Sequence, residues 1–170
     1  ELAGIAEKSL QWLVNEQLAA DGTFSPVGTN GFYVRGAPRA TFDQQPVEAC
    51  AVVSACLDAH RLTGEAEWLE HARCAFHWFL GQNPREAQVY DARTGGCRDG
   101  IHADRMNENE GAESTLSLLT ALAELRAADR LAARLVPVAT SPRARPRAPR
   151  AASMLGGRLA GPPGAATRCS

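Results

Sequence analysis

Two polar stretches hold the residues best suited to chemistry, and each leads straight into an apolar segment. The first contains Asp43, Gln44, Gln45 and Glu48 and continues into the apolar run 49–57. Carboxylates supply acid–base groups, and carboxamides supply paired hydrogen-bond donors and acceptors. This combination is typical of a site that binds and processes a hydroxyl-rich ligand such as a sugar.

The second polar stretch has the same character and enters the apolar segment 116–122. Asp99 and His102 precede this stretch. Its carboxamides and carboxylates are Asn107, Glu108, Asn109, Glu110 and Glu113. Helix capping accounts for one acidic residue at a helix start, and the helix dipole favours others there. Capping does not require the carboxamides as well. We therefore predict that both stretches contribute side chains to one shared site.

Cleavage of a glycosidic bond needs one carboxylic acid and a second carboxylate, which assigns roles to these residues. Glu48 lies one turn into a helix, where partial burial raises the pKa of a carboxyl group and favours the acid role. Glu110 or Glu113 is its expected counterpart, and Asp43 is a further catalytic candidate. We assign the other polar groups to substrate binding: Gln44, Gln45, Asp99, His102, Asn107, Asn109 and Tyr33.

Other site chemistries have weaker support in the sequence. Zinc needs three or four converging ligands, whereas Cys97 and His102 are the only candidate pair and Cys50 and Cys56 fall within an apolar helix pattern. We predict neither a metal nor a cofactor. The three tryptophans lie in helix patterns and are expected in the core, whereas Tyr33 lies in a loop and is expected to stack on a sugar.

Four helices must position these residues, at 2–19, 45–62, 65–80 and 112–134. The first and third have one apolar stripe, whereas the second and fourth are apolar on most sides. We therefore predict an all-α fold in which the second and fourth helices are the more buried. Long loops, 21–41 and 81–110, precede these two helices and should meet at one end.

The motifs 41–49, 95–100 and 107–115, in this order, resemble a bacterial family of α/α-toroid domains. These domains occur alone or C-terminal to family-4-type glycosyltransferases. The resemblance covers residues 1 to about 130 and implies a ring of alternating outer and inner helices. Since the complete ring has more helices than this chain supplies, the chain resembles its C-terminal portion.

The resemblance implies a carbohydrate-active protein, because the wider superfamily includes glycoside hydrolases and sugar epimerases. The alternative is a non-catalytic glycan-binding or structural module that accompanies a glycosyltransferase. The chain lacks the Gly-rich nucleotide-sugar motif of a transferase domain. Its expected partners are a sugar or glycan, the missing N-terminal toroid helices or a glycosyltransferase domain, and further copies of itself.

Composition separates a foldable part, 1–135, from a tail, 136–170. The tail is rich in Pro, Arg, Ala and Gly and has no aromatic residue, so we expect it to be disordered and basic. The first 130 residues hold 11 basic and 19 acidic residues, a balance of −8 that disfavours nucleic-acid binding. The chain starts at Glu1 and not at a Met, which suggests that an N-terminal part is missing.

The five cysteines are an odd number at irregular spacing, which predicts reduced thiols and a cytoplasmic protein. The longest apolar run, 49–57, is too short to cross a membrane. We expect neither a membrane span nor a disulfide framework.

Overall fold

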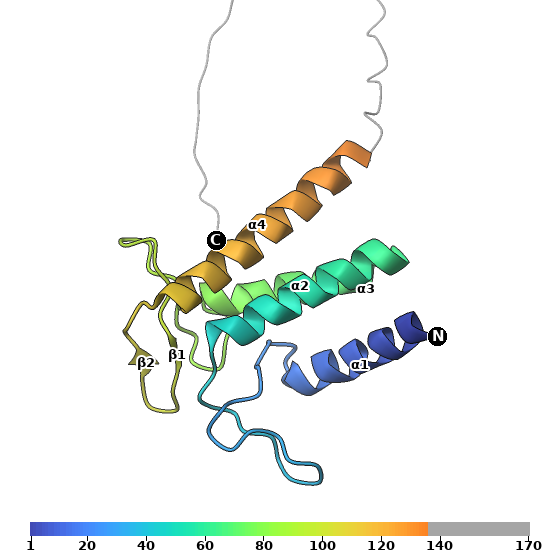
Figure 1. Ribbon diagram of the computed structural model, residues 1–170. Helices are drawn as coiled ribbons and strands as arrows, with labels where there is room; N and C mark the ends of the chain where they lie inside the picture. Colours follow the sequence, from blue (N-terminus) through green and yellow to red (C-terminus); the bar gives the residue numbers. More distant parts are fainter. Residues whose placement is uncertain (136–170) are drawn as a thin grey trace, which may run out of the picture. The chain divides into compact units, whose positions relative to one another are not determined.

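The computed structural model describes residues 1–135, so the predicted tail 136–170 lies outside the described residues. The described part is mostly helical, which confirms the predicted all-α class with four α-helices (Figure 1). The helices are α1 (Leu2–Gln17), α2 (Pro46–Thr63), α3 (Ala66–His77) and α4 (Ala112–Leu135), and α3 continues into the short 3-10 helix η1 (Trp78–Leu80). The antiparallel strands β1 (Gly100–Ile101) and β2 (Met106–Asn107) form a small hairpin that the sequence analysis did not predict.

Local sequence signals explain where α2 begins and ends. Pro46 occupies the first turn, where its missing N–H leaves no bond unmade. Gln45 and Glu48 form a capping box, in which the Gln45 N–H donates to Glu48 Oε2 at 3.1 Å. Gly64 ends the helix with φ 77°, a left-handed conformation that glycine adopts without a steric cost. The predicted bounds of α2 are therefore correct to within a residue.

The core forms around α2, which packs mainly against α3 and α4. Val53, Cys56 and Leu57 of α2 are fully buried, as are Trp78 and Phe79 of η1. Figure 1 shows that α2 and α4 run in the same direction, whereas α1 and α3 run in the opposite one. The N-terminal ends of α2 and α4 lie at the same end of this unit, where the loops 18–45 and 81–111 gather. The predicted meeting of the two polar stretches at one end is confirmed.

The predicted ranking of helix burial is wrong for α3 and α4. α3 buries Trp68, Leu69, Ala72 and Ala75, although the sequence analysis placed this helix on the outside. α4 instead leaves Leu116, Leu119 and Leu131 exposed at 62%, 49% and 54%. The physical reason is that α4 packs one face on α2 and leaves its other apolar face open within the described part of the chain. An apolar pattern on all sides of a helix indicates that burying its surface is favourable. It does not indicate that the described part of this chain packs against every side.

We expect the leucine face of α4, defined by Leu116, Leu119 and Leu131, to drive self-association, because apolar surface of this kind is favourable to bury. Replacing Leu116 and Leu119 together by Glu should weaken association of the chain at least tenfold, measured by sedimentation velocity over a concentration series. Leu62→Glu, another exposed leucine at the end of α2, serves as the control. A wild-type chain that stays monomeric at every concentration would contradict this expectation.

Candidate functional site

A backbone layer of three short segments joins the two polar stretches. The Gln44 N–H donates to the Ile101 carbonyl at 3.0 Å, and the Ile101 N–H donates back to the Gln44 carbonyl at 2.9 Å. In the β1–β2 hairpin, Gly100 lies opposite Asn107. Position 100 needs glycine, because a Cβ there would lie 2.5 Å from the Gln44 carbonyl oxygen. Two-residue strands have no readable alternation, so the sequence carried no signal for this layer.

Within this layer, Asp43 and His102 form a close carboxylate–imidazole pair. Nδ1 of His102 lies 2.5 Å from Oδ1 of Asp43, and the two side chains are 25% and 34% exposed. Because a carboxylate only accepts, Nδ1 donates, and in the neutral ring Nε2 is then the acceptor. The arrangement is that of a base held in orientation by an acid. The sequence analysis proposed both residues for the site but did not pair them.

The backbone fixes both members of this pair. The Thr29 N–H and Oγ1 donate to the Asp43 carbonyl at 2.9 and 3.3 Å. The His102 N–H donates to the Arg105 carbonyl at 2.9 Å, which closes the hairpin turn. Gly28 lies against the Phe42 backbone so closely that any Cβ would clash with it. The side chains of Asp43 and His102 therefore extend from two segments that are tied to each other and to the loop before α2.

The side chain of Gln44, which the sequence analysis assigned to substrate binding, lies inside the core. Its side chain is fully buried, where Nε2 donates to Ser25 Oγ at 3.0 Å and to the Thr41 carbonyl at 2.8 Å. Its Oε1 accepts from the indole Nε1 of Trp78 at 2.7 Å. The carboxamide thus has a partner for each of these groups inside the core. Gln44 is a structural residue that anchors the loop to η1.

Glu48 is half-buried, and burial raises the pKa of its carboxyl group, as the sequence predicted. The carboxylate accepts from the Gln45 N–H and closes the capping box, so it holds the start of α2. Gln45 is exposed and serves as the N-cap. Both residues therefore have a structural task at the start of α2.

Asp99 ties the start of α4 to the hairpin and is committed to that role. Its Oδ1 accepts from the Gly111 N–H at 2.8 Å and from Ser114 Oγ at 2.6 Å, and its Oδ2 accepts from the Asn109 carboxamide. These bonds, led by the one from Ser114, lower the pKa of Asp99. The Asn109 N–H in turn donates to Oδ1 of Asn107 at 3.2 Å. The substrate-binding roles predicted for Asp99, Asn107 and Asn109 are not supported, because their polar groups form hydrogen bonds within the turn before α4.

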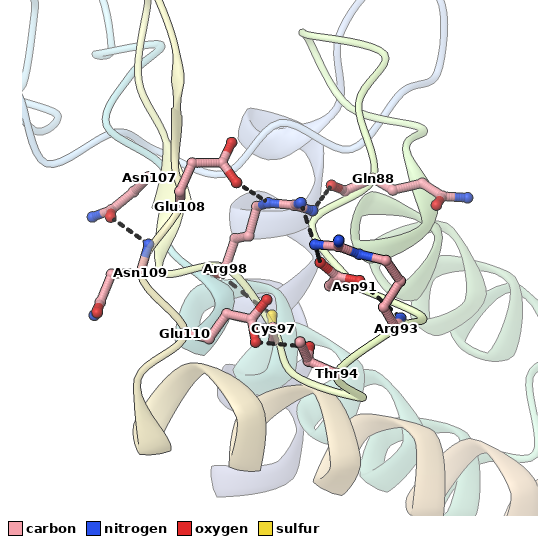
Figure 2. Close-up of polar contacts among 10 residues, drawn as sticks. All are labelled: Gln88, Asp91, Arg93, Thr94, Cys97, Arg98, Asn107, Glu108, Asn109 and Glu110. Atoms are coloured by element: carbon pink, nitrogen blue, oxygen red, sulfur yellow. Dashed lines mark hydrogen bonds and ion pairs between the residues drawn. The ribbon is translucent and has the colours of Figure 1, made fainter.

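Figure 2 shows a second polar network, which fastens the loop 88–98 to the stretch 107–110. At its centre, Arg98 Nε donates to Glu108 Oε2 at 2.7 Å, Nη1 donates to the Gln88 carbonyl at 3.1 Å, and Nη2 lies 3.5 Å from Asp91 Oδ2. The sequence analysis missed Arg98 and Asp91. The position of Arg98 directly before Asp99, which the sequence analysis did name, was the available signal.

Glu110 belongs to the same network, since its Oε2 accepts from Thr94 Oγ1 at 2.8 Å. Gly96 lies close to this carboxylate, and an added Cβ at position 96 would displace the Glu110 side chain. Glu113 is exposed in the first turn of α4, where the helix dipole favours an acid. The predicted pairing of Glu48 with Glu110 or Glu113 across one pocket is therefore not supported: Glu48 and Glu110 hold separate partners, and the pockets described below are lined by other residues.

Asp99→Ala should destabilise the fold by about 1–2 kcal/mol at pH 7, through loss of a charged cap. Because the pKa of Asp99 is lowered on folding, its contribution is present above the usual aspartate pKa and disappears as pH falls through the lowered value. Urea unfolding at pH 7 and near pH 2 measures this difference. The exposed Asp104→Ala is the control, and an unchanged free energy of unfolding for Asp99→Ala at pH 7 would refute the capping role.

The described cysteines, Cys50, Cys56, Cys74 and Cys97, are free thiols. Burial raises the pKa of Cys56 and of Cys97 to about 12, so both are protonated, inert core residues at neutral pH. Within residues 1–135, no group of three or more His, Cys, Asp or Glu side chains is arranged to hold a metal ion. In the same range, no helix combines the length and apolar character that a membrane crossing requires.

The fold and the site define a helical domain with a loop-borne polar site at the shared N-terminal end of α2 and α4. No protein-family model and no curated protein matches this sequence.

Proposed function

We propose that this chain is part of a carbohydrate-active α/α-toroid protein in which the Asp43–His102 pair transfers a proton on a sugar. The observation that carries the proposal is the partly exposed imidazole of His102, 2.5 Å from a carboxylate, at the end where the loops gather. The motif resemblance described above supplies the substrate class. The Asp43–His102 pair is better suited to sugar epimerisation or isomerisation than to the hydrolysis of a glycosidic bond.

The chemistry needs no other reactant. In the open-chain form of a sugar, Nε2 of neutral His102 takes the proton from the carbon next to the carbonyl. The C–H electrons form the double bond of an enediolate, and the carbonyl oxygen takes the negative charge. Return of the proton on the same face to the former carbonyl carbon gives the isomer, as the proton of the neighbouring hydroxyl moves to the oxygen that took the charge. Return to the original carbon gives the epimer once the enediolate has turned its opposite face to His102. Asp43 stabilises the imidazolium that exists between the two steps, as acids paired with histidine do.

Two-carboxylate hydrolysis has less support. It requires an acid and a second carboxylate that both face the scissile bond. Glu48 closes a capping box, Glu110 binds Thr94, and Asp99 caps α4. Each carboxylate would have to leave its partner before it could act on a sugar.

A second candidate function is a non-catalytic glycan-binding module that accompanies a glycosyltransferase. This candidate is favoured by the structural hydrogen bonds that most of the predicted catalytic carboxylates form. In either function, the leucine face of α4 is where we place the remaining toroid helices, a glycosyltransferase domain or a second copy of the chain. The free thiols fit a reducing compartment such as the cytoplasm.

A single experiment separates these functions. The whole chain is incubated with common aldohexoses and their N-acetylamino forms, and products are followed by NMR. Interconversion of two sugars that requires His102 supports proton transfer. Binding without conversion supports the accessory module, and the absence of both overturns the assignment to carbohydrate.

A further inference from the structure

Trp12 and Tyr33 form an exposed aromatic pair. Their ring centroids lie 6.2 Å apart with planes 10° from parallel, and the side chains are 54% and 37% exposed. Trp12 comes from α1 and Tyr33 from the loop before α2. The expectation that Trp12 packs in the core is therefore wrong, whereas Trp68 and Trp78 are buried as expected. A large aromatic ring left in solvent beside a second one requires an explanation.

The pair borders a hollow and lies near charged groups. Trp12, Tyr33, Arg35 and Gly36 line a hollow of about 440 Å³. The negative charge of Glu16 in α1 raises the pKa of the Tyr33 phenol. Tyr33 of the loop therefore lies near α1, the helix that also carries Trp12.

Arg39 connects the aromatic pair to a larger polar pocket. Its positive charge acts on Tyr33, and its Nη1 donates to the Ser25 carbonyl at 2.7 Å. It also lines a pocket of about 550 Å³, whose other polar lining residues include Asp21, Thr23, Ser25, Thr41 and Gln82. Ser25 and Thr41 are the residues that bind the Gln44 carboxamide, so the wall of this pocket is anchored to the core.

We infer that the Trp12–Tyr33 pair and the adjoining polar pocket form a binding surface for an extended neutral oligosaccharide. A pyranose ring has an apolar C–H face that can be buried against aromatic rings, and its hydroxyls pair with the amides, hydroxyls and charged groups of the pocket. The pocket volume lies in the range typical of ligand sites. This inference rests on the proposed function for its ligand class, but it concerns different residues.

The charges on this surface favour an uncharged ligand. Arg35 and Arg39 lie beside the aromatic pair, whereas Asp21 and Glu86 line the pocket. An acidic polysaccharide would meet both acids, and a cationic ligand would meet both arginines. A neutral sugar avoids both penalties and uses each group as a hydrogen-bond partner.

The test is a titration of the whole chain with cellohexaose, maltohexaose and, as the charged comparator, hexagalacturonate. Binding is followed by NMR of the Trp12 indole N–H in the wild type, and by isothermal titration calorimetry in the wild type and every variant. A neutral hexaose should shift this resonance, and Trp12→Ala or Tyr33→Ala should weaken its binding at least tenfold. Trp12→Phe should retain most of the affinity, and Glu113→Gln, remote from the pair in sequence, should bind like the wild type. Because Trp12 and Tyr33 are exposed, these variants should keep the wild-type unfolding midpoint.

Unchanged binding in both alanine variants would overturn the inference, as would a response to hexagalacturonate alone or to none of the three. Its failure is distinguishable from failure of the proposed function. Asp43→Asn should lower the rate of sugar conversion strongly but leave hexaose binding intact. Trp12→Ala should instead weaken hexaose binding and leave the conversion of a monosaccharide intact.

Discussion

Gln44→Leu is expected to destabilise the fold by about 3–5 kcal/mol, a large share of the stability of a small domain. The substitution removes the acceptor of the Trp78 indole N–H and the donor to Ser25 and Thr41, all at a fully buried position. Leucine has nearly the volume of glutamine, so the loss reports unsatisfied polar groups and not a cavity. Urea unfolding followed by tryptophan fluorescence measures it.

The matched control is Gln82→Leu, which makes the same change at an exposed glutamine and should alter the free energy of unfolding by less than about 0.5 kcal/mol. Gln44→Glu is a second probe, because it keeps an acceptor for Trp78 but loses the donor and buries a charge. It should destabilise at least as much as leucine at pH 7 and less at low pH, where the acid is neutral. Equal stabilities of Gln44→Leu and Gln82→Leu would show that the carboxamide is not an anchor.

His102→Asn should lower the rate of sugar interconversion by about 10²- to 10⁴-fold, the usual contribution of a general base. Asp43→Asn should lower it comparably, since the amide neither orients Nδ1–H as a carboxylate does nor stabilises the imidazolium. Because the two residues act as one unit, the double variant should be no slower than the slower single variant. Steady-state kinetics with the sugar identified in the panel measures all three.

Glu113→Gln is the matched control for this pair. Glu113 is an exposed acid at the same end of the unit, and the sequence analysis named it as a catalytic candidate. It should retain wild-type activity within about twofold, because surface substitutions of this kind have small effects. If Glu113→Gln were inactive and His102→Asn active, the two-carboxylate mechanism would be correct.

The sequence was sufficient to predict the helices because their signals are local. Pro46, the capping residues and Gly64 mark the bounds of α2, and hydrophobic spacing marks its body. The hairpin around Gly100 has no such signal, since its strands span two residues each and depend on pairing with Gln44. Burial of α4 was mispredicted because exposure depends on which neighbours are present.

The two polar stretches lie at one end as predicted, but most of their side chains hold structural hydrogen bonds that the sequence analysis did not predict. Composition shows that carboxylates and carboxamides gather near two helix starts, and they do lie at one end. It does not show which groups are already satisfied by the fold. Gln44 binds inside the core and Asp99 caps α4, while the unanticipated pairing of Asp43 with His102 leaves an imidazole free to act.

Solvent deuterium incorporation tests the central claim most directly. The whole chain is incubated in D2O with the aldohexose and N-acetylaminohexose panel, and the hydrogen on the carbon next to the carbonyl is followed by NMR. Proton transfer by His102 predicts that this hydrogen is replaced by deuterium with the wild-type chain and with Glu113→Gln, but not with His102→Asn. Products without carbon-bound deuterium, or equal incorporation with wild type and His102→Asn, would contradict the account.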